Sequence, residues 1–272
     1  MKSFNTLAVR VMVAIPGIAL FAAVVFLDLT LLTSAFFALI AAFCAAEAVT
    51  LFRPGSGIRM KAGLAVMVGG ASVAVALLEP AVSLVLILLP GAVISAVLIL
   101  GDGVNHARRN TAGITGISVI LALGFGLLAR LRLDFQSPWV IFVPLLICWF
   151  GDSLAYFAGS AFGRHKMAPS ISPAKSWEGF FAGIAGAVGG ALLAGAAGAG
   201  FPPVVMIVIG AAGGIAAVTG DLLESAMKRD AGVKDSGKFL PGHGGFLDRF
   251  DSILAVVPVV WVLLYLFAGN SA

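Results

Sequence analysis

Long, almost uninterrupted apolar runs fill this chain and decide what it can fold into. Hydrophobic residues make up 60% of the 272 positions and charged residues only 11%, and the mean hydropathy is +1.08. A chain of this composition has too little polar surface to cover a water-soluble globule. A membrane-spanning helix needs about 20 mostly apolar residues, and runs of that kind recur along the sequence. We therefore predict an all-α, polytopic integral membrane protein.

The number of apolar runs predicts a bundle of about nine transmembrane helices. The runs occupy 11–27, 29–52, 62–78, 81–100, 112–129, 139–162, 179–200, 204–227 and 252–267. The first, third and ninth runs are short. None of the runs alternates between apolar and polar residues, so a transmembrane β-barrel is not expected.

Basic residues gather on one side of the predicted bundle. With the N-terminus placed in the cytoplasm, only Arg130 and Arg132 of the 17 Lys and Arg residues fall on the opposite side. Cytoplasmic loops carry such an excess of positive charge. We therefore expect a cytoplasmic N-terminus, an external C-terminus and a multi-pass protein of the inner (cytoplasmic) membrane.

Polar residues are distributed unevenly, and this divides the chain into two regions with different predicted roles. Residues 1–133 are predicted to form structural, lipid-facing helices, in which acidic residues such as Glu47 are assigned no role. Residues 134–272 are predicted to form the catalytic region, with cytoplasmic loops at 163–178 and 228–251. Both cysteines lie within apolar runs, so neither a disulfide framework nor a metal cluster is implied.

Three carboxylates interrupt the apolar runs of the second region: Asp152, Asp221 and Glu224. Ionisable groups at membrane depth are functional candidates because burying them without a partner is costly. Asp221, Glu224 and Lys228 share one helical face. A Glu224–Lys228 salt bridge that stabilises the bundle is the structural alternative for that pair. Asp221 has no such local cation, which favours a functional role.

The loop at 163–178 combines basic and hydroxyl side chains directly before a predicted helix. Lys175, Ser176 and Glu178 stand at that junction. Cations and hydroxyls at a helix N-terminus suit a polyphosphate, because the backbone N–H groups and the helix dipole attract anions. A basic loop held by anionic lipid headgroups is the alternative.

The loop at 228–251 is rich in glycine and in basic residues, among them Lys228, Arg229 and Lys234. Asp248 and Asp251 follow one helical turn apart, where the last apolar run begins. Carboxylates that converge with phosphate oxygens are the usual ligands of Mg²⁺. A helix cap with a neighbouring salt bridge is the alternative for both.

His243 lies between glycines in the same loop. A phosphate donor, a general acid and a structural hydrogen-bonding group all remain open for this side chain. Cations, Mg²⁺-type carboxylates and no evident covalent nucleophile together favour phosphoryl or nucleotidyl transfer, in which catalysis is mostly positioning and charge neutralisation.

The order of residues from Ser225 to Asp251 adds a family resemblance. It reads S-x-hydrophobic-KR-x4-KD-x-small-x2-hydrophobic-P-x-HGG-hydrophobic-x-DR-hydrophobic-D, and in this it resembles the C-terminal signature of phosphatidate cytidylyltransferases, also called CDP-diacylglycerol synthases. DSLAYFAG at 152–159 and ISPAKSWEG at 171–179 are also similar to blocks of that family, with Ser176 where Thr is at least as frequent.

The resemblance implies that CTP and phosphatidic acid react at the cytoplasmic membrane face to give CDP-diacylglycerol and pyrophosphate. It also implies Mg²⁺, leaves a second metal or a monovalent cation open, and makes a homodimer plausible; membrane lipids are the other partners, and no nucleic acid is expected. We assign the metal to Asp221 and Asp248, the nucleotide phosphates to Lys175, Ser176, Lys228, Arg229 and Lys234, an orienting role to Glu178 and His243, and a supporting catalytic role to Asp152, Glu224 and Asp251.

Two rival functions remain at this point. In a transporter or channel, Asp152, Asp221 and Glu224 would form an ion path, but the long basic loop would have no task. The same nucleotidyl transfer to another lipid phosphate, such as a polyprenyl phosphate, is the nearer rival, because contacts with acyl chains are apolar and interchangeable.

Overall fold

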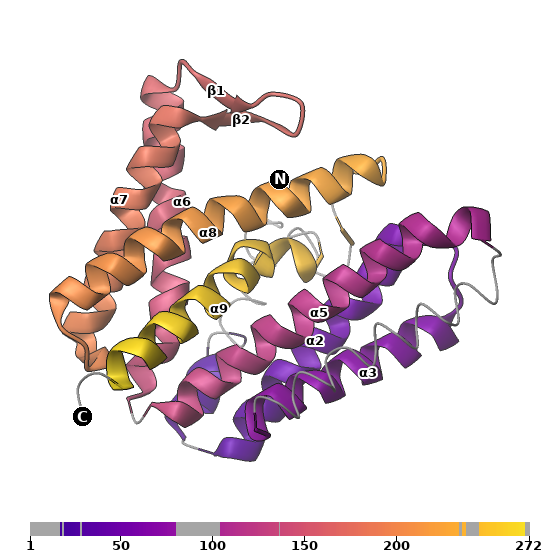
Figure 1. Ribbon diagram of the computed structural model, residues 1–272, viewed down its shortest axis with the longest axis horizontal. Helices are drawn as coiled ribbons and strands as arrows, with labels where there is room; N and C mark the ends of the chain where they lie inside the picture. Colours follow the sequence, from indigo (N-terminus) through magenta and orange to yellow (C-terminus); the bar gives the residue numbers. More distant parts are fainter. Residues whose placement is uncertain are drawn as a thin grey trace, which may run out of the picture. The chain divides into compact units, whose positions relative to one another are not determined.

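The computed structural model describes residues 17, 19–27, 29–79, 104–135, 137–233, 236–237 and 245–269 (Figure 1). These residues are almost entirely helical, which confirms the all-α prediction. Within them, seven helices are long and apolar enough to cross a membrane. The predicted run at 81–100 lies outside the described residues and the run at 11–27 only partly within them, so the count of nine stays a prediction.

The chain divides into two compact units. The N-terminal unit comprises Met1–Leu133 and Val233–Arg249, and the C-terminal unit comprises Asp134–Gly232 and Phe250–Ala272. The second predicted loop, 228–251, is therefore shared between them. Most of its residues group with the N-terminal helices and not with the region that precedes them in sequence.

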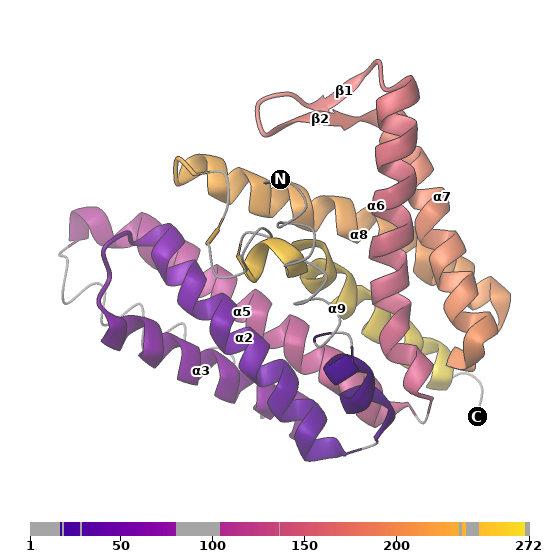
Figure 2. The ribbon, with the colours of Figure 1, turned by 180° about the vertical axis from the view of Figure 1, so that it is seen from behind.

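Three helices form most of the described N-terminal unit: α2 (Thr30–Phe52), α3 (Ile58–Leu77) and α5 (Val104–Asp134). They lie side by side in both ribbon views (Figures 1 and 2). A Cβ atom built on Gly126 of α5 would lie 2.5 Å from Cβ of Val75 in α3, so the glycine is what allows these helices to approach closely.

The C-terminal unit begins with a short 3₁₀ turn, η1 (Pro138–Ile141), followed by α6 (Phe142–Phe162). The chain returns along α7 (Trp177–Ala194) and the π-helical turn η2 (Gly195–Ala199), then crosses the pair as α8 (Pro203–Asp230) (Figure 1). α8 starts with Pro203 at its first position, where proline has no intrahelical hydrogen bond to lose.

The last helix, α9 (Leu247–Gly269), starts in the N-terminal unit and continues in the C-terminal one. In the C-terminal unit it packs closely on α8, since a Cβ atom on Gly220 would lie 2.6 Å from Cβ of Ala255. Farther along, the Trp261 indole N–H donates a hydrogen bond to Asp134 (2.9 Å). This bond satisfies the polar edge of a large aromatic ring.

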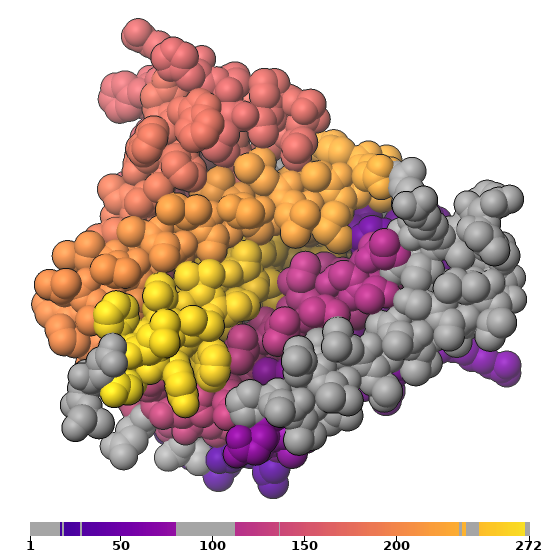
Figure 3. Space-filling view, in the orientation of Figure 1, coloured from indigo at the N-terminus to yellow at the C-terminus, as the bar shows by residue number. Residues whose placement is uncertain are grey.

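The loop predicted at 163–178 contains a small antiparallel hairpin that the sequence did not indicate. β1 (Lys166–Ala168) pairs with β2 (Ser172–Ser176), with Lys166 opposite Ser176 and Ala168 opposite Ser172. Strands this short show no usable alternation of polarity. The hairpin joins α6 to α7 and projects from them (Figure 3).

Glycines on α7 provide a test of its packing on α6. A Cβ atom at Gly190 would overlap the Leu146 carbonyl oxygen, whereas a Cβ atom at the neighbouring Gly189 meets nothing within 4 Å. We expect Gly190→Ala to lower the free energy of unfolding by about 1–3 kcal/mol, as overpacked contacts do. Gly189→Ala is the matched control and should leave it unchanged or slightly higher. Thermal unfolding in detergent compares the two, and equal midpoints would contradict the packing described.

Candidate functional site

Ser176 stands where the hairpin meets α7, and its hydroxyl caps the helix. The Gly179 N–H donates to Ser176 Oγ (3.2 Å), and the side chain is only 3% exposed. The end of α6 crosses just beside it, because a Cβ atom on Gly163 would lie 2.7 Å from the same oxygen. Ser176 thus satisfies one of the unpaired N–H groups at the start of α7. Its contact with a nucleotide stays a prediction.

Glu178, in the first turn of α7, fastens the base of the hairpin. Its Oε1 accepts hydrogen bonds from Nδ1 of His165 (2.6 Å) and from the His165 backbone N–H (3.2 Å). The His165 carbonyl in turn accepts the Trp177 N–H (2.9 Å). A negative side chain is also favourable at a helix N-terminus. Glu178 therefore fixes the segment that leads from α6 into β1.

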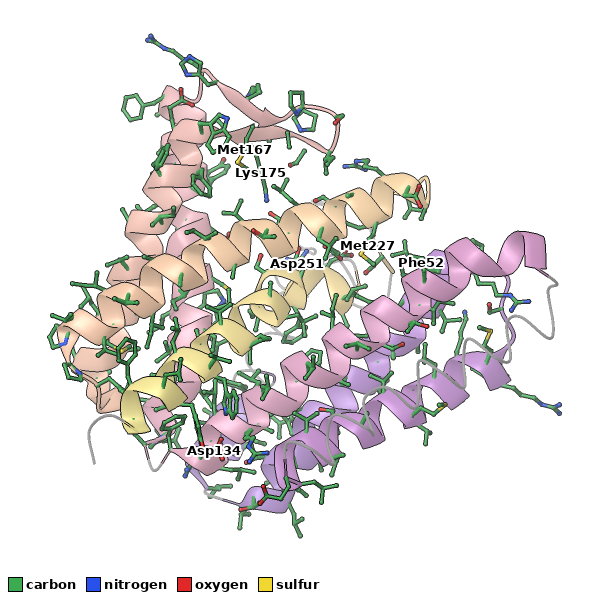
Figure 4. The ribbon with its side chains drawn as sticks, in the orientation of Figure 1. Phe52, Asp134, Met167, Lys175, Met227 and Asp251 are labelled. Carbon is green, nitrogen blue, oxygen red and sulfur yellow. The ribbon has the colours of Figure 1, made fainter. Side chains whose placement is uncertain are left out.

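Lys175 on β2 reaches from the hairpin to α8 and forms an ion pair with Asp221. Lys175 Nζ and Asp221 Oδ2 are 2.6 Å apart, and Figure 4 shows the lysine extending toward α8. Ser225, one turn farther along α8, donates its hydroxyl proton to Asp221 Oδ1 (3.2 Å). The cation that the α8 sequence does not offer to Asp221 comes from the first loop. Two predicted site residues are thereby brought together.

The second pair on α8 joins Glu224 to Lys228, one turn apart, at 2.9 Å. The structural alternative considered for this pair is therefore geometrically present. Both side chains are well buried, and Oε1 of Glu224 has no hydrogen-bond partner among the described residues. A buried carboxylate oxygen without a donor is energetically unfavourable. This oxygen is open to a further cation or donor.

Two more predicted carboxylates lie near these pairs in the C-terminal unit. Asp152 of α6 is within electrostatic range of Asp221 and Asp251, and of Lys175. Asp251 of α9 also interacts with Glu224; Figure 4 labels its position beside α8. Four carboxylates and two lysines from α6, β2, α8 and α9 thus form one polar cluster inside an otherwise apolar unit.

The cluster contains only oxygen ligands, which suit Mg²⁺. Within the described residues no three His, Cys, Asp or Glu side chains lie close enough to form a complete metal site. Mg²⁺ commonly uses one or two carboxylates and takes its remaining oxygens from substrate phosphates and water. The open oxygen of Glu224 and the partly exposed Asp221 fit that need.

Asp248 belongs to the N-terminal unit, where its carboxylate binds backbone N–H groups. Ser236 N–H donates to Oδ1 and Oδ2 (3.1 and 3.0 Å), and Gly245 N–H donates to Oδ2 (3.0 Å). These contacts resemble the capping role that is the alternative for Asp248 at the start of α9. A carboxylate offers about four acceptor positions, so its predicted pairing with Asp221 on a metal stays a prediction.

Glu47 of α2 is the residue that sequence reasoning missed. Its Oε2 accepts the Leu247 N–H (3.1 Å) and the Ser236 hydroxyl (3.5 Å), so it contacts both sides of the signature loop. The available signal was a lone carboxylate inside the apolar run 29–52. The sequence separation of 200 residues from Leu247 concealed the partner.

The remaining predicted residues are less fully described. Lys228 and Arg229 lie in the last turn of α8, where positive charge complements the helix dipole. Lys234 and His243 lie outside the described residues, so their predicted roles stay predictions.

Comparison with known proteins confirms the family resemblance seen in the signature. A family profile described as "Cytidylyltransferase family" matches residues 8–267. A phosphatidate cytidylyltransferase of Bacillus subtilis is 41% identical over 157 residues, which cover 57% of this chain and 58% of the relative. That of Pseudomonas aeruginosa is 39% identical over 163 residues (55% and 56%), and that of Haemophilus influenzae 39% over 145 residues (47% and 49%). The chain thus spans about half the length of the curated relatives it matches.

The Glu178–His165 contact can be tested without any assumption about substrate. We expect Glu178→Ala to loosen the base of the hairpin, so that trypsin cuts severalfold faster after the exposed Lys166. Ser160→Ala is the control, because that hydroxyl donates only to the Phe157 carbonyl of its own helix among the bonds described. Equal cleavage rates in the two variants would show that Glu178 does not fasten the hairpin.

Proposed function

The chain belongs to the cytidylyltransferase family, and from that premise we propose that it transfers the cytidylyl group of CTP to phosphatidic acid. The products are CDP-diacylglycerol and pyrophosphate. The observation that carries this proposal is the ion pair between Lys175 and Asp221, which joins the basic hairpin to α8, the helix that ends in Lys228 and Arg229. The names of the curated relatives support phosphatidic acid over another lipid phosphate as the acceptor.

The reaction is an in-line displacement at phosphorus. An oxygen of the lipid phosphate attacks the α-phosphorus of CTP and forms a new P–O bond. The bond from that phosphorus to the oxygen bridging to the β-phosphate breaks, and pyrophosphate leaves with the electron pair. Both reactants are anions, so the protein's main task is to neutralise and align them.

The polar cluster of the C-terminal unit suits this task. Lys175 and Lys228 are cations held on rigid elements by carboxylate partners, and Arg229 adds charge at the end of α8. Asp221, with Asp248 as the second ligand predicted from sequence, would hold Mg²⁺. When bound, that ion would reduce the repulsion between the two anions.

A membrane-embedded enzyme fits a substrate that stays in the bilayer. Phosphatidic acid has two acyl chains, so its headgroup meets a water-soluble nucleotide only at the membrane interface. The distribution of basic residues supports the cytoplasmic face of the inner membrane as that interface. The acyl chains would remain among the apolar helices.

Pyrophosphate release by the purified protein tests the proposal directly. We expect release from CTP only when both phosphatidic acid and Mg²⁺ are present, with CDP-diacylglycerol identified as the lipid product by mass spectrometry. Turnover with a polyprenyl phosphate in place of phosphatidic acid would assign another acceptor. Solute or charge movement without CTP consumption would favour a transporter instead.

Replacing Asp221 tests whether the polar cluster contributes to catalysis or only to folding. Asp221→Asn removes the negative charge facing Lys175 and should lower kcat by about 100-fold or more, the scale of losing one well-placed electrostatic group. Asp134→Asn is the matched control, because Asp134 binds Trp261 far from the cluster in the same unit (Figure 4). Activity of Asp221→Asn within about tenfold of the control would remove Asp221 from the site.

A further inference from the structure

One carboxylate outside the polar cluster makes contacts that the proposed mechanism does not use. Glu47 lies on α2, and its Oε2 accepts the backbone N–H of Leu247, the first residue of α9. That N–H is one of the four at a helix start that have no partner inside the helix. Glu47 therefore caps α9 from a different helix, and its negative charge suits the position.

A second carboxylate holds the same stretch of chain. Asp248 accepts backbone N–H groups of Ser236 and Gly245, while Glu47 accepts the Ser236 hydroxyl and the Leu247 N–H. Ser236 thus binds both carboxylates. The two acidic side chains together fix the chain on either side of residues 238–244.

The backbone beside Glu47 is shaped to admit this carboxylate. A Cβ atom on Gly237 would lie 2.6 Å from Glu47 Oε1, and one on Gly245 would lie 2.5 Å from Oε2. Any larger residue at either position would displace the carboxylate. One turn earlier on α2, the Phe43 ring stacks on Phe246 at 5.5 Å between ring centres, with 12° between the planes.

Both oxygens of the Glu47 carboxylate lie against the signature loop, beside Gly237 and Gly245. Its Oε1 is buried and has no hydrogen-bond partner in the part of the chain that is described. Hydrogen bonds to a carboxylate are stronger than those to a neutral acceptor. The Leu247 N–H bond at 3.1 Å is the shorter of the two contacts, and the Ser236 hydroxyl at 3.5 Å is the longer.

We propose that Glu47 is a positioning residue for the reaction: by fixing Ser236 and Leu247 it sets the orientation of Asp248. This inference rests on the proposed function only for its catalytic consequence. Some residues do not touch the substrate or metal but orient a ligand that does. Removing such a residue typically lowers activity or metal affinity by about 10- to 100-fold.

Hydrogen exchange of the protein in detergent tests the contact independently of activity. In Glu47→Ala we expect the amides of Ser236, Gly245 and Leu247 to exchange about tenfold faster, the change expected when hydrogen bonds to a charged group are lost. Glu47→Gln keeps one acceptor of equal reach and should be intermediate. Glu79→Gln, an exposed carboxylate after α3 in the same unit, is the matched control and should exchange like the original protein. Unchanged exchange in Glu47→Ala would overturn the proposal.

The kinetic consequence is measured with the same variants. Glu47→Ala should lower kcat by about 10- to 100-fold and raise the Mg²⁺ concentration needed for half activity, while KM for phosphatidic acid stays the same and Glu47→Gln recovers part of the loss. A merely structural role predicts instead a smaller folded fraction with an unchanged Mg²⁺ midpoint, and that result would overturn the positioning role. If the unsubstituted protein forms no CDP-diacylglycerol, the proposed function is overturned. The exchange rates would still decide whether Glu47 holds the loop.

Discussion

The rest of this structure depends on one constraint: a carboxylate inside an apolar helix must find a donor. Asp221 finds Lys175 on the hairpin, Glu224 finds Lys228 one turn away, and Glu47 finds backbone N–H groups of the signature loop. Two of these contacts hold a loop against a helix: the hairpin against α8 through Lys175, and the signature loop against α2 through Glu47. The Glu224–Lys228 pair stays within α8. In each case the partner offsets the cost of a carboxylate in apolar surroundings. Charged side chains therefore help to determine which distant segments of this chain contact each other.

Glycine residues allow these close contacts. Gly163, at the end of α6, leaves room for the Ser176 hydroxyl at the start of α7. Gly237 and Gly245 leave room for the Glu47 carboxylate in the same way. In both places a polar group approaches a backbone more closely than a side chain would allow. Two glycines of the signature loop, Gly237 and Gly245, are thus explained by their close approach to Glu47 of α2.

The helices were predictable from sequence because length and hydropathy are local properties, and the described helices fall on the predicted runs. The site was predictable only in part. The Glu224–Lys228 pair is visible at helical spacing, whereas the Lys175–Asp221 pair and the Glu47 contacts join residues far apart in the chain. A single sequence shows that such a charge needs a partner, but not which partner it has. Glu47 lies in the region predicted to be structural and lipid-facing, although its position in an apolar run carries the same signal as that of Asp221.

On the proposed function, the ion pairs would let a site for two anions form before either arrives. A carboxylate on a membrane helix is unfavourable without a partner. The ion pair with Lys175 of the hairpin supplies that partner for Asp221. On the proposed function, Lys175 would pair with phosphate oxygens of the nucleotide, and Asp221 would help to hold the Mg²⁺ that lowers their charge.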